Sequence, residues 1–139
     1  MISYPRHCYI TKNLIVWQKA MELVRIVYRL SKAFPAEERY ALTDQLRRAA
    51  VSVPSNIAEG NGRAGNRDYA HFLSIARGSL FETMTQLEIA EGLGYLNLGD
   101  ADFAQADQIA GEVNGMLTAM LRKYGAFESR PRPFTSTST

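Results

Sequence analysis

Apolar residues recur at the three- and four-residue spacing of helices over four long stretches of the chain, and no segment of useful length alternates as a strand does. The pattern predicts helices from Leu14 to Ala33, from Arg39 to Glu59, from Asn66 to Leu93 and from just after Asp100 to Tyr124. The segments between them are short and contain prolines and glycines, which end helices. Four helices joined by short loops predict an all-α, up-down antiparallel four-helix bundle.

The first predicted helix is apolar around most of its circumference. Asn13 is the expected N-cap, and Pro35 prevents the helix from continuing. Its polar residues form only a narrow stripe, whereas its apolar residues are Val16, Trp17, Ala20, Met21, Leu23, Val24, Ile26, Val27, Tyr28 and Leu30. A helix of this kind is buried on more than one side. We therefore expect one side to face the core of the protomer and the other to face a second subunit.

The third and fourth predicted helices carry one apolar stripe each. The stripes consist of Tyr69, Phe72, Leu73, Ala76, Leu80, Met84, Leu87 and Ala90 in the third helix, and of Phe103, Ala106, Ile109, Ala110, Val113, Leu117, Met120 and Tyr124 in the fourth. Aromatic residues on stripes of this kind include Trp17, Tyr28, Tyr69 and Tyr124. We interpret these four side chains as packing residues rather than as platforms for stacked bases.

The second predicted helix continues through a proline. Apolar residues keep helical spacing on both sides of Pro54, which predicts a kinked helix held by tertiary packing, because an interior proline costs about 3 kcal/mol. The carbonyl of Ala50 loses its usual partner there, and Ser52, Ser55 and Asn56 are candidates to satisfy it. A structural role is favoured over a nucleophilic one for Ser55, since no histidine is near in sequence and no Gly-x-Ser-x-Gly elbow is present.

Three blocks of the sequence resemble a known family. They are Leu14–Ala20, Gln45–Gly60, and a third block made of Phe72–Leu80, Gln86–Ala90 and Leu93–Leu96. In this order and spacing they resemble the four-helix bundle proteins encoded in intervening sequences of 23S ribosomal RNA genes. The resemblance implies a ring-shaped homopentamer. It extends to the accessory variability determinant of diversity-generating retroelements, a basic pentamer that binds nucleic acid, and it supplies no catalytic residues.

Charge is unevenly distributed along the chain. Residues 1–63 contain ten Lys/Arg and five Asp/Glu, a net charge of +5, whereas residues 64–139 contain six and nine, a net charge of −3. The formal net charge of the whole chain is +2, so a homopentamer would carry +10 and repeat each basic patch five times. The candidate phosphate-binding residues on this basis are Arg25, Arg29, Lys32, Arg39, Arg47, Arg48, Arg63 and Arg67.

Two parts of this basic set have a structural alternative. Arg48 shares a helix face with Asp44 and Glu59, so an ion pair with one of these carboxylates is favoured over a phosphate contact. Arg63 and Arg67 lie in a glycine-containing loop before a helix N-terminus, which could hold a phosphate. The spacing matches no Walker motif or dinucleotide fingerprint, so a plain helix–helix connection is the favoured interpretation there.

The sequence predicts no metal, no cofactor and no enzyme. A carboxylate-bridged di-iron bundle requires two Glu-x-x-His motifs and two further glutamates, whereas this chain has one Asp68-x-x-His71. Glu82, Glu88 and Glu91 are too scattered to form an acid/base pair.

Length and composition predict one domain in three parts: a flexible leader at residues 1–12, the bundle at residues 13–124, and a disordered tail at residues 125–139. Cys8 is the only cysteine, so an intrachain disulfide is impossible. No signal-peptide core and no apolar run of about 20 residues is present, which predicts a cytoplasmic protein without a membrane partner.

The leading hypothesis is a non-enzymatic, homo-oligomeric protein that binds RNA or DNA through phosphate contacts. A protein–protein scaffold without a nucleic-acid role is the alternative. An enzyme with an unfamiliar site at a subunit junction is a third and weaker one.

Overall fold

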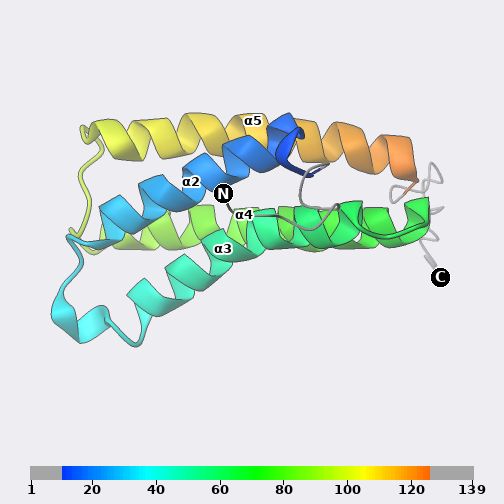
Figure 1. Ribbon diagram of the computed structural model, residues 1–139. Helices are drawn as coiled ribbons and strands as arrows, with labels where there is room; N and C mark the ends of the chain where they lie inside the picture. The colour runs from blue at the N-terminus through cyan, green and yellow to red at the C-terminus, as the bar shows by residue number, and fades with distance from the viewer. Residues whose placement is uncertain (1–10, 126–139) are drawn as a thin grey trace, which may run out of the picture.

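The structure is a computed structural model in which residues 11–125 are described. It contains the long helices α2 (Ile15–Ser31), α3 (Leu42–Asn61), α4 (Asn66–Gly92) and α5 (Ala101–Tyr124), and the short 3₁₀ helix η1 (Ala36–Glu38). Successive long helices run in alternating directions, as Figure 1 shows, and each packs on two neighbours, in the order α2, α3, α4, α5 and back to α2. The all-α, up-down four-helix bundle that the sequence predicts is therefore confirmed.

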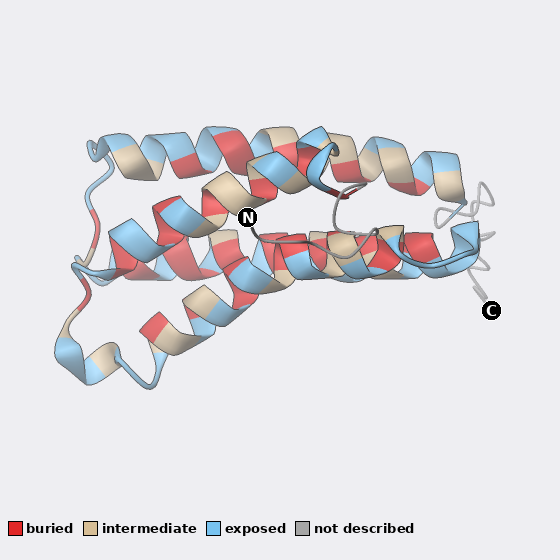
Figure 2. Ribbon diagram, viewed as in Figure 1, coloured by how far each residue is buried: buried red, intermediate tan, exposed pale blue. Residues whose placement is uncertain are grey.

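The core of the bundle consists of one buried stripe from each helix, which Figure 2 shows in red along the facing sides. Its largest fully buried side chains include Leu23, Leu46, Leu73, Leu80 and Leu117. Burial of a leucine side chain stabilises the fold by about 1.5–3 kcal/mol relative to leaving it in water. Ser52 and Ser79 add a polar link between α3 and α4, with their hydroxyl oxygens 2.8 Å apart.

The helix ends differ from the sequence prediction by a few residues. α2 begins after Leu14 rather than Asn13 and has no side-chain cap, because the Leu14 amide donates to the carbonyl of Thr11 in a preceding turn. α3 begins at Leu42 rather than Arg39, since the chain first winds into η1 and the Glu38 carboxylate accepts the Leu42 amide at 3.1 Å. The start of α5 is as expected, with Asp100 accepting the amide of Asp102.

α3 remains helical through Pro54, and Pro54 itself is buried. The hydroxyl of Ser55 donates to the carbonyl of Val51 at 2.7 Å, and the amide of Asn56 donates to the carbonyl of Ser52 at 2.8 Å. Both side chains reach back four residues, one helical turn, to the carbonyls of Val51 and Ser52. That a polar group satisfies the carbonyl of Ala50 stays a prediction. Figure 1 shows α3 slanting across the bundle in its first half and following α4 in its second. That Pro54 sets this change of direction stays a proposal.

The second half of α3 approaches α4 closely at Gly60. A Cβ atom at Gly60 would lie 2.8 Å from Cβ of Phe72 and 2.9 Å from Cδ2 of Tyr69, a separation that side chains do not tolerate. Glycine is therefore required for the packing of α3 on α4 at this end of the bundle.

The expected leader at residues 1–12 and tail at residues 125–139 fall almost entirely outside the described residues. Thr11 is buried, and its hydroxyl accepts a hydrogen bond from the Asn61 side chain.

Candidate nucleic-acid interface

The outward side of α2 carries a basic surface with an apolar floor. Arg25, Arg29 and Lys32 follow one another at four- and three-residue spacing, so they lie along one side of the helix. Together with Val24 and Tyr28 they line a shallow depression of about 480 Å³. We call these five residues the α2 depression. Its chemistry, three cations around an aliphatic and an aromatic side chain, suits a ligand that combines negative charge with a flat apolar group.

Tyr28 is held in place by a side chain from α3. The guanidinium carbon of Arg47 lies 4.7 Å from the centroid of the Tyr28 ring, in cation–π contact. Nε of Arg47 donates to the Ser31 hydroxyl at 2.8 Å, and that hydroxyl donates to the carbonyl of Tyr28 at 3.1 Å. Arg47 thus connects α3 to the basic side of α2 and fixes the position of the ring.

Tyr28 was assigned to the core from the sequence, and this assignment was wrong. Tyr28 is 39% exposed, because α2 buries the stripe that contains Leu23, Ile26 and Leu30 and turns Tyr28 outward. The sequence does contain a usable signal, since Tyr28 lies three residues after Arg25 and four before Lys32, between them on the helix surface. Tyr69, by contrast, packs in the core as the sequence predicts. It is buried against Tyr124 with ring centroids 4.7 Å apart, and burial raises the pKa of Tyr69 to about 12.

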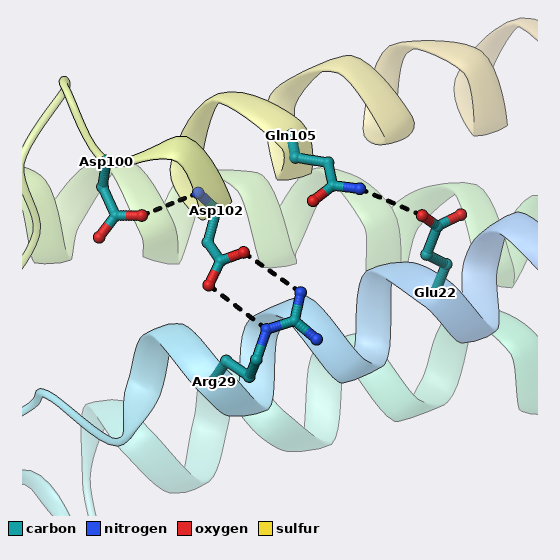
Figure 3. Close-up of polar contacts among 5 residues, drawn as sticks. All are labelled: Glu22, Arg29, Asp100, Asp102 and Gln105. Carbon is teal, nitrogen blue, oxygen red and sulfur yellow. Dashed lines mark hydrogen bonds and ion pairs between the residues drawn. The ribbon is translucent and has the colours of Figure 1, made fainter.

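Arg29 is already paired within the protomer (Figure 3). Its guanidinium donates side-on to both carboxylate oxygens of Asp102, at 3.3 and 3.2 Å, and this hydrogen bonding raises the pKa of Arg29 further. Gln105 and Glu22 form a second link between α5 and α2 at 3.2 Å. Arg29 therefore faces the α2 depression with its charge partly neutralised, and its side chain also holds α5 against α2.

Arg48 forms an ion pair within α3, and Arg63 of the α3–α4 loop pairs with a carboxylate near the end of α3. Nε of Arg48 lies 2.9 Å from Asp44, which is the structural alternative favoured by the sequence. A terminal nitrogen of Arg63 lies 2.6 Å from Glu59, and its guanidinium covers the ring of Phe72 at 5.0 Å. Exposed pairs of this kind are weak, but they compete with a phosphate for the same guanidinium donors.

Four predicted phosphate-binding residues remain, and all four are exposed: Arg25, Lys32, Arg39 and Arg67. None of them forms an ion pair within residues 11–125. Arg25, Lys32 and Arg39 belong to α2 and the turn that follows it. Arg67 belongs to the first turn of α4, and Lys32 is the C-cap of α2. Figure 1 shows that the start of α4 and the end of α2 lie at opposite ends of the bundle. The structure therefore brings part of the predicted basic set together on α2 and separates the residues of the α3–α4 loop from it.

The second half of the bundle has the opposite charge. Residues 78–121 contain seven acidic residues and no Lys or Arg; the acids are Glu82, Glu88, Glu91, Asp100, Asp102, Asp107 and Glu112. Glu112 pairs with Lys19 of α2 at 2.6 Å, and this hydrogen bond lowers the pKa of the Glu112 carboxyl. α4 also exposes apolar side chains, with Ile75, Phe81 and Ile89 between 39 and 46% exposed.

Within residues 11–125, no three His, Cys, Asp or Glu side chains gather as a metal site would require. Nor does any helix in this part of the chain have the length and apolar character to cross a membrane.

Comparison with known proteins identifies the family. The chain is similar to a solved structure from Bacteroides thetaiotaomicron VPI-5482, described as a protein with unknown function from the S23 ribosomal protein family, with 22% identity over 78% of this chain and 99% of that one and a TM-score of 0.69. At this identity the likeness shows the fold alone. No curated protein matches the chain. Neither this solved structure nor the family match given next indicates an enzyme family. The model of the 23S rRNA-intervening sequence proteins matches residues 12–119, and the chain therefore belongs to that family.

Proposed function

We propose that this chain is a non-enzymatic, cytoplasmic, homo-oligomeric protein that binds RNA or DNA through phosphate contacts on the outward side of α2. The observation that carries the proposal is the set of exposed cations on and just after α2, Arg25, Lys32 and Arg39, which no carboxylate of the described residues neutralises. Unpaired arginine and lysine on one surface attract phosphate and release its counterions.

The charge pattern supports one orientation of this binding. Acidic residues occupy α5 and the second half of α4, so a polyanion is repelled there and attracted to α2 and α3. Binding of this type is largely independent of sequence, because phosphate contacts position a nucleic acid without identifying its bases.

Exposed apolar side chains support a homo-oligomer. Ile75, Phe81 and Ile89 of α4 are each more than a third exposed, and Trp17 and Met21 of α2 are half-buried on the side expected to meet a second subunit. We infer that the first half of α2, at Trp17 and Met21, meets the exposed apolar side of α4 between copies, which leaves the α2 depression in the second half of the helix open. We infer further that the ring is a pentamer, as the family resemblance implies.

The test of nucleic-acid binding is the fluorescence anisotropy of labelled structured RNA and duplex DNA, titrated with protein at several salt concentrations. We expect log affinity for the duplex to fall with log salt by about 0.9 for each phosphate neutralised. The double variant Arg25→Glu/Lys32→Glu should weaken binding roughly tenfold or more, because two phosphate-facing cations become repulsive.

A matched control is available at the end of α5. Arg122→Glu/Lys123→Glu makes the same change in net charge on two exposed residues outside the α2 depression. We expect it to retain most of the affinity. Equal losses in the two variants would assign the effect to total charge, and flat titrations of both nucleic acids at low salt would remove the proposed function.

The exposed apolar side of α4 favours a second candidate, a scaffold that binds another protein. Such a contact would be nearly insensitive to salt, in contrast to phosphate binding. It gains support if nucleic-acid titrations are flat while variants of Ile75, Phe81 or Ile89 abolish a protein complex.

A further inference from the structure

Tyr28 is an exposed aromatic ring in the middle of a cationic surface, and nothing in the packing of the core requires it there. The ring is 39% exposed, whereas its neighbours Ile26 and Val27 are fully buried. Because Arg47 and Ser31 hold the side chain and backbone of Tyr28, little conformational entropy remains to be lost when a ligand contacts the ring.

Tyr28 also borders the α2 depression and remains partly exposed beside Arg47. The α2 depression is lined by Val24, Arg25, Tyr28, Arg29 and Lys32, and Arg47 does not line it. The guanidinium of Arg47, although it lies on the Tyr28 ring, therefore does not fill the depression. A flat ligand in the depression would contact the ring of Tyr28 and the aliphatic side chain of Val24.

The rim of the depression supplies phosphate contacts on both sides of such a ligand. Arg25 and Lys32 are seven residues apart, a separation of about 10 Å along the helix axis. Neither of them forms an ion pair within the described residues. Arg29 lies between them along the helix and is paired with Asp102. A strand whose base occupies the depression would place its flanking phosphates near these cations.

This arrangement selects against a duplex. Bases of a duplex are stacked on one another and offer no free ring face, whereas unpaired bases stack on aromatic side chains of proteins. We propose, building on the nucleic-acid binding proposed above, that the α2 depression is a stacking site for the base of an unpaired nucleotide, so that this surface binds single-stranded nucleic acid in preference to duplex.

The first experiment needs only the unaltered protein. Anisotropy titrations compare a labelled single-stranded oligothymidylate with an abasic strand of equal length, which keeps every phosphate and lacks every base. We expect the oligothymidylate to bind roughly five- to a hundredfold more tightly, the range found when one stacked base is lost. The two strands should show the same salt dependence, because their charge is equal.

Variants of Tyr28 test the assignment to this ring. Tyr28→Ala should remove most of the preference for the strand that has bases, while its affinity for the abasic strand and its salt dependence remain unchanged. Tyr28→Phe should keep the preference, because the ring remains. Tyr40→Ala is the matched control, since Tyr40 is 89% exposed and does not line the depression.

The outcomes separate this inference from the proposed function. Tight, salt-dependent and equal binding of both strands by the unaltered protein would overturn the stacking site and leave phosphate binding intact. Failure of both strands to bind at low salt would overturn both proposals. A preference that persists in Tyr28→Ala, with an unchanged thermal melt, would show that the base is recognised elsewhere.

Discussion

The outward sides of α2 and α4 rest on the same core but differ in chemistry. α2 presents Arg25, Arg29 and Lys32 around an exposed tyrosine, whereas the second half of α4 has acidic side chains and exposed apolar ones without any Lys or Arg. The buried stripes of both helices are ordinary for a bundle, so apart from the pairing of Arg29 with Asp102 the fold requires little of either outward side. The partners that we propose for the two sides differ accordingly: phosphate for α2, and an apolar protein surface for α4.

The largest effect is expected from unfolding the protomer, which would remove the outward sides of α2 and α4 together. Val53 is fully buried beside Pro54, so Val53→Asp places an unpaired charge in the core and should cost about 4 kcal/mol or more, enough to unfold most small domains. Thermal unfolding followed by circular dichroism measures this loss. Val51→Asp is the matched control, since Val51 is on the same helix and 40% exposed. A cooperative melt at the wild-type temperature for Val53→Asp would contradict the burial of this residue.

A second change should abolish only the function of the α4 side. Ile89 is 46% exposed, so Ile89→Arg leaves the protomer folded but introduces a charge into the proposed contact between copies. We expect light scattering to fall from a mass near five times the protomer toward 15.5 kDa, with unchanged helicity. Leu98→Arg serves as the control, because Leu98 is 71% exposed in the α4–α5 loop. A 15.5 kDa mass for the unaltered protein would remove the oligomer proposal.

A smaller effect is expected at the close contact between α3 and α4. Gly60→Ala forces a methyl group into Phe72 and Tyr69, and overpacking of this kind costs about 1–3 kcal/mol. Gly78→Ala is the matched control: Gly78 is within α4, has nothing within 4 Å of an added Cβ, and should gain about 0.5–1 kcal/mol from better helix propensity. Urea unfolding distinguishes the two, and equal stabilities would show that α3 and α4 separate readily at Gly60.

The smallest expected effect concerns pH and the link between α2 and α5. Hydrogen bonding to Lys19 lowers the pKa of the Glu112 carboxyl below its ordinary value. The stabilising contribution of this carboxylate is therefore present above its unfolded pKa and is lost as pH falls through the lowered, folded pKa. We expect carboxyl NMR titration to show the lowered pKa, and Lys19→Met to return it toward the ordinary value. An unchanged pKa in that variant would assign the shift to another group.

The sequence predicts most of the fold because helix periodicity is local. The apolar spacing on either side of Pro54 predicts a continuous helix, and Leu46, Val53 and Ile57 are all fully buried as that spacing requires. The family could also be identified from short blocks, since each block is a stretch of one or two helices. Boundaries were less accurate, because the η1 turn and the Glu38 contact to Leu42 depend on how the chain turns between helices.

The site was predicted only in part, because the neighbours of each charge come from other helices. Arg29 pairs with Asp102, 73 residues away, and Arg47 meets Ser31 and Tyr28 across the α2–α3 contact. No spacing within a helix indicates these partners. Local spacing can anticipate only pairs such as Arg48 with Asp44, which was expected, and Arg63 with Glu59, which was not, since the partners in each pair are four residues apart.

By itself the sequence determined the four helices, the buried stripes and the basic and acidic halves, because each depends on residue type and local spacing. The tertiary structure alone decided which cations remain unpaired, and it turned Tyr28 outward beneath Arg47. Both outcomes depend on the rotation of each helix about its own axis, which is set when all four stripes are packed into one core.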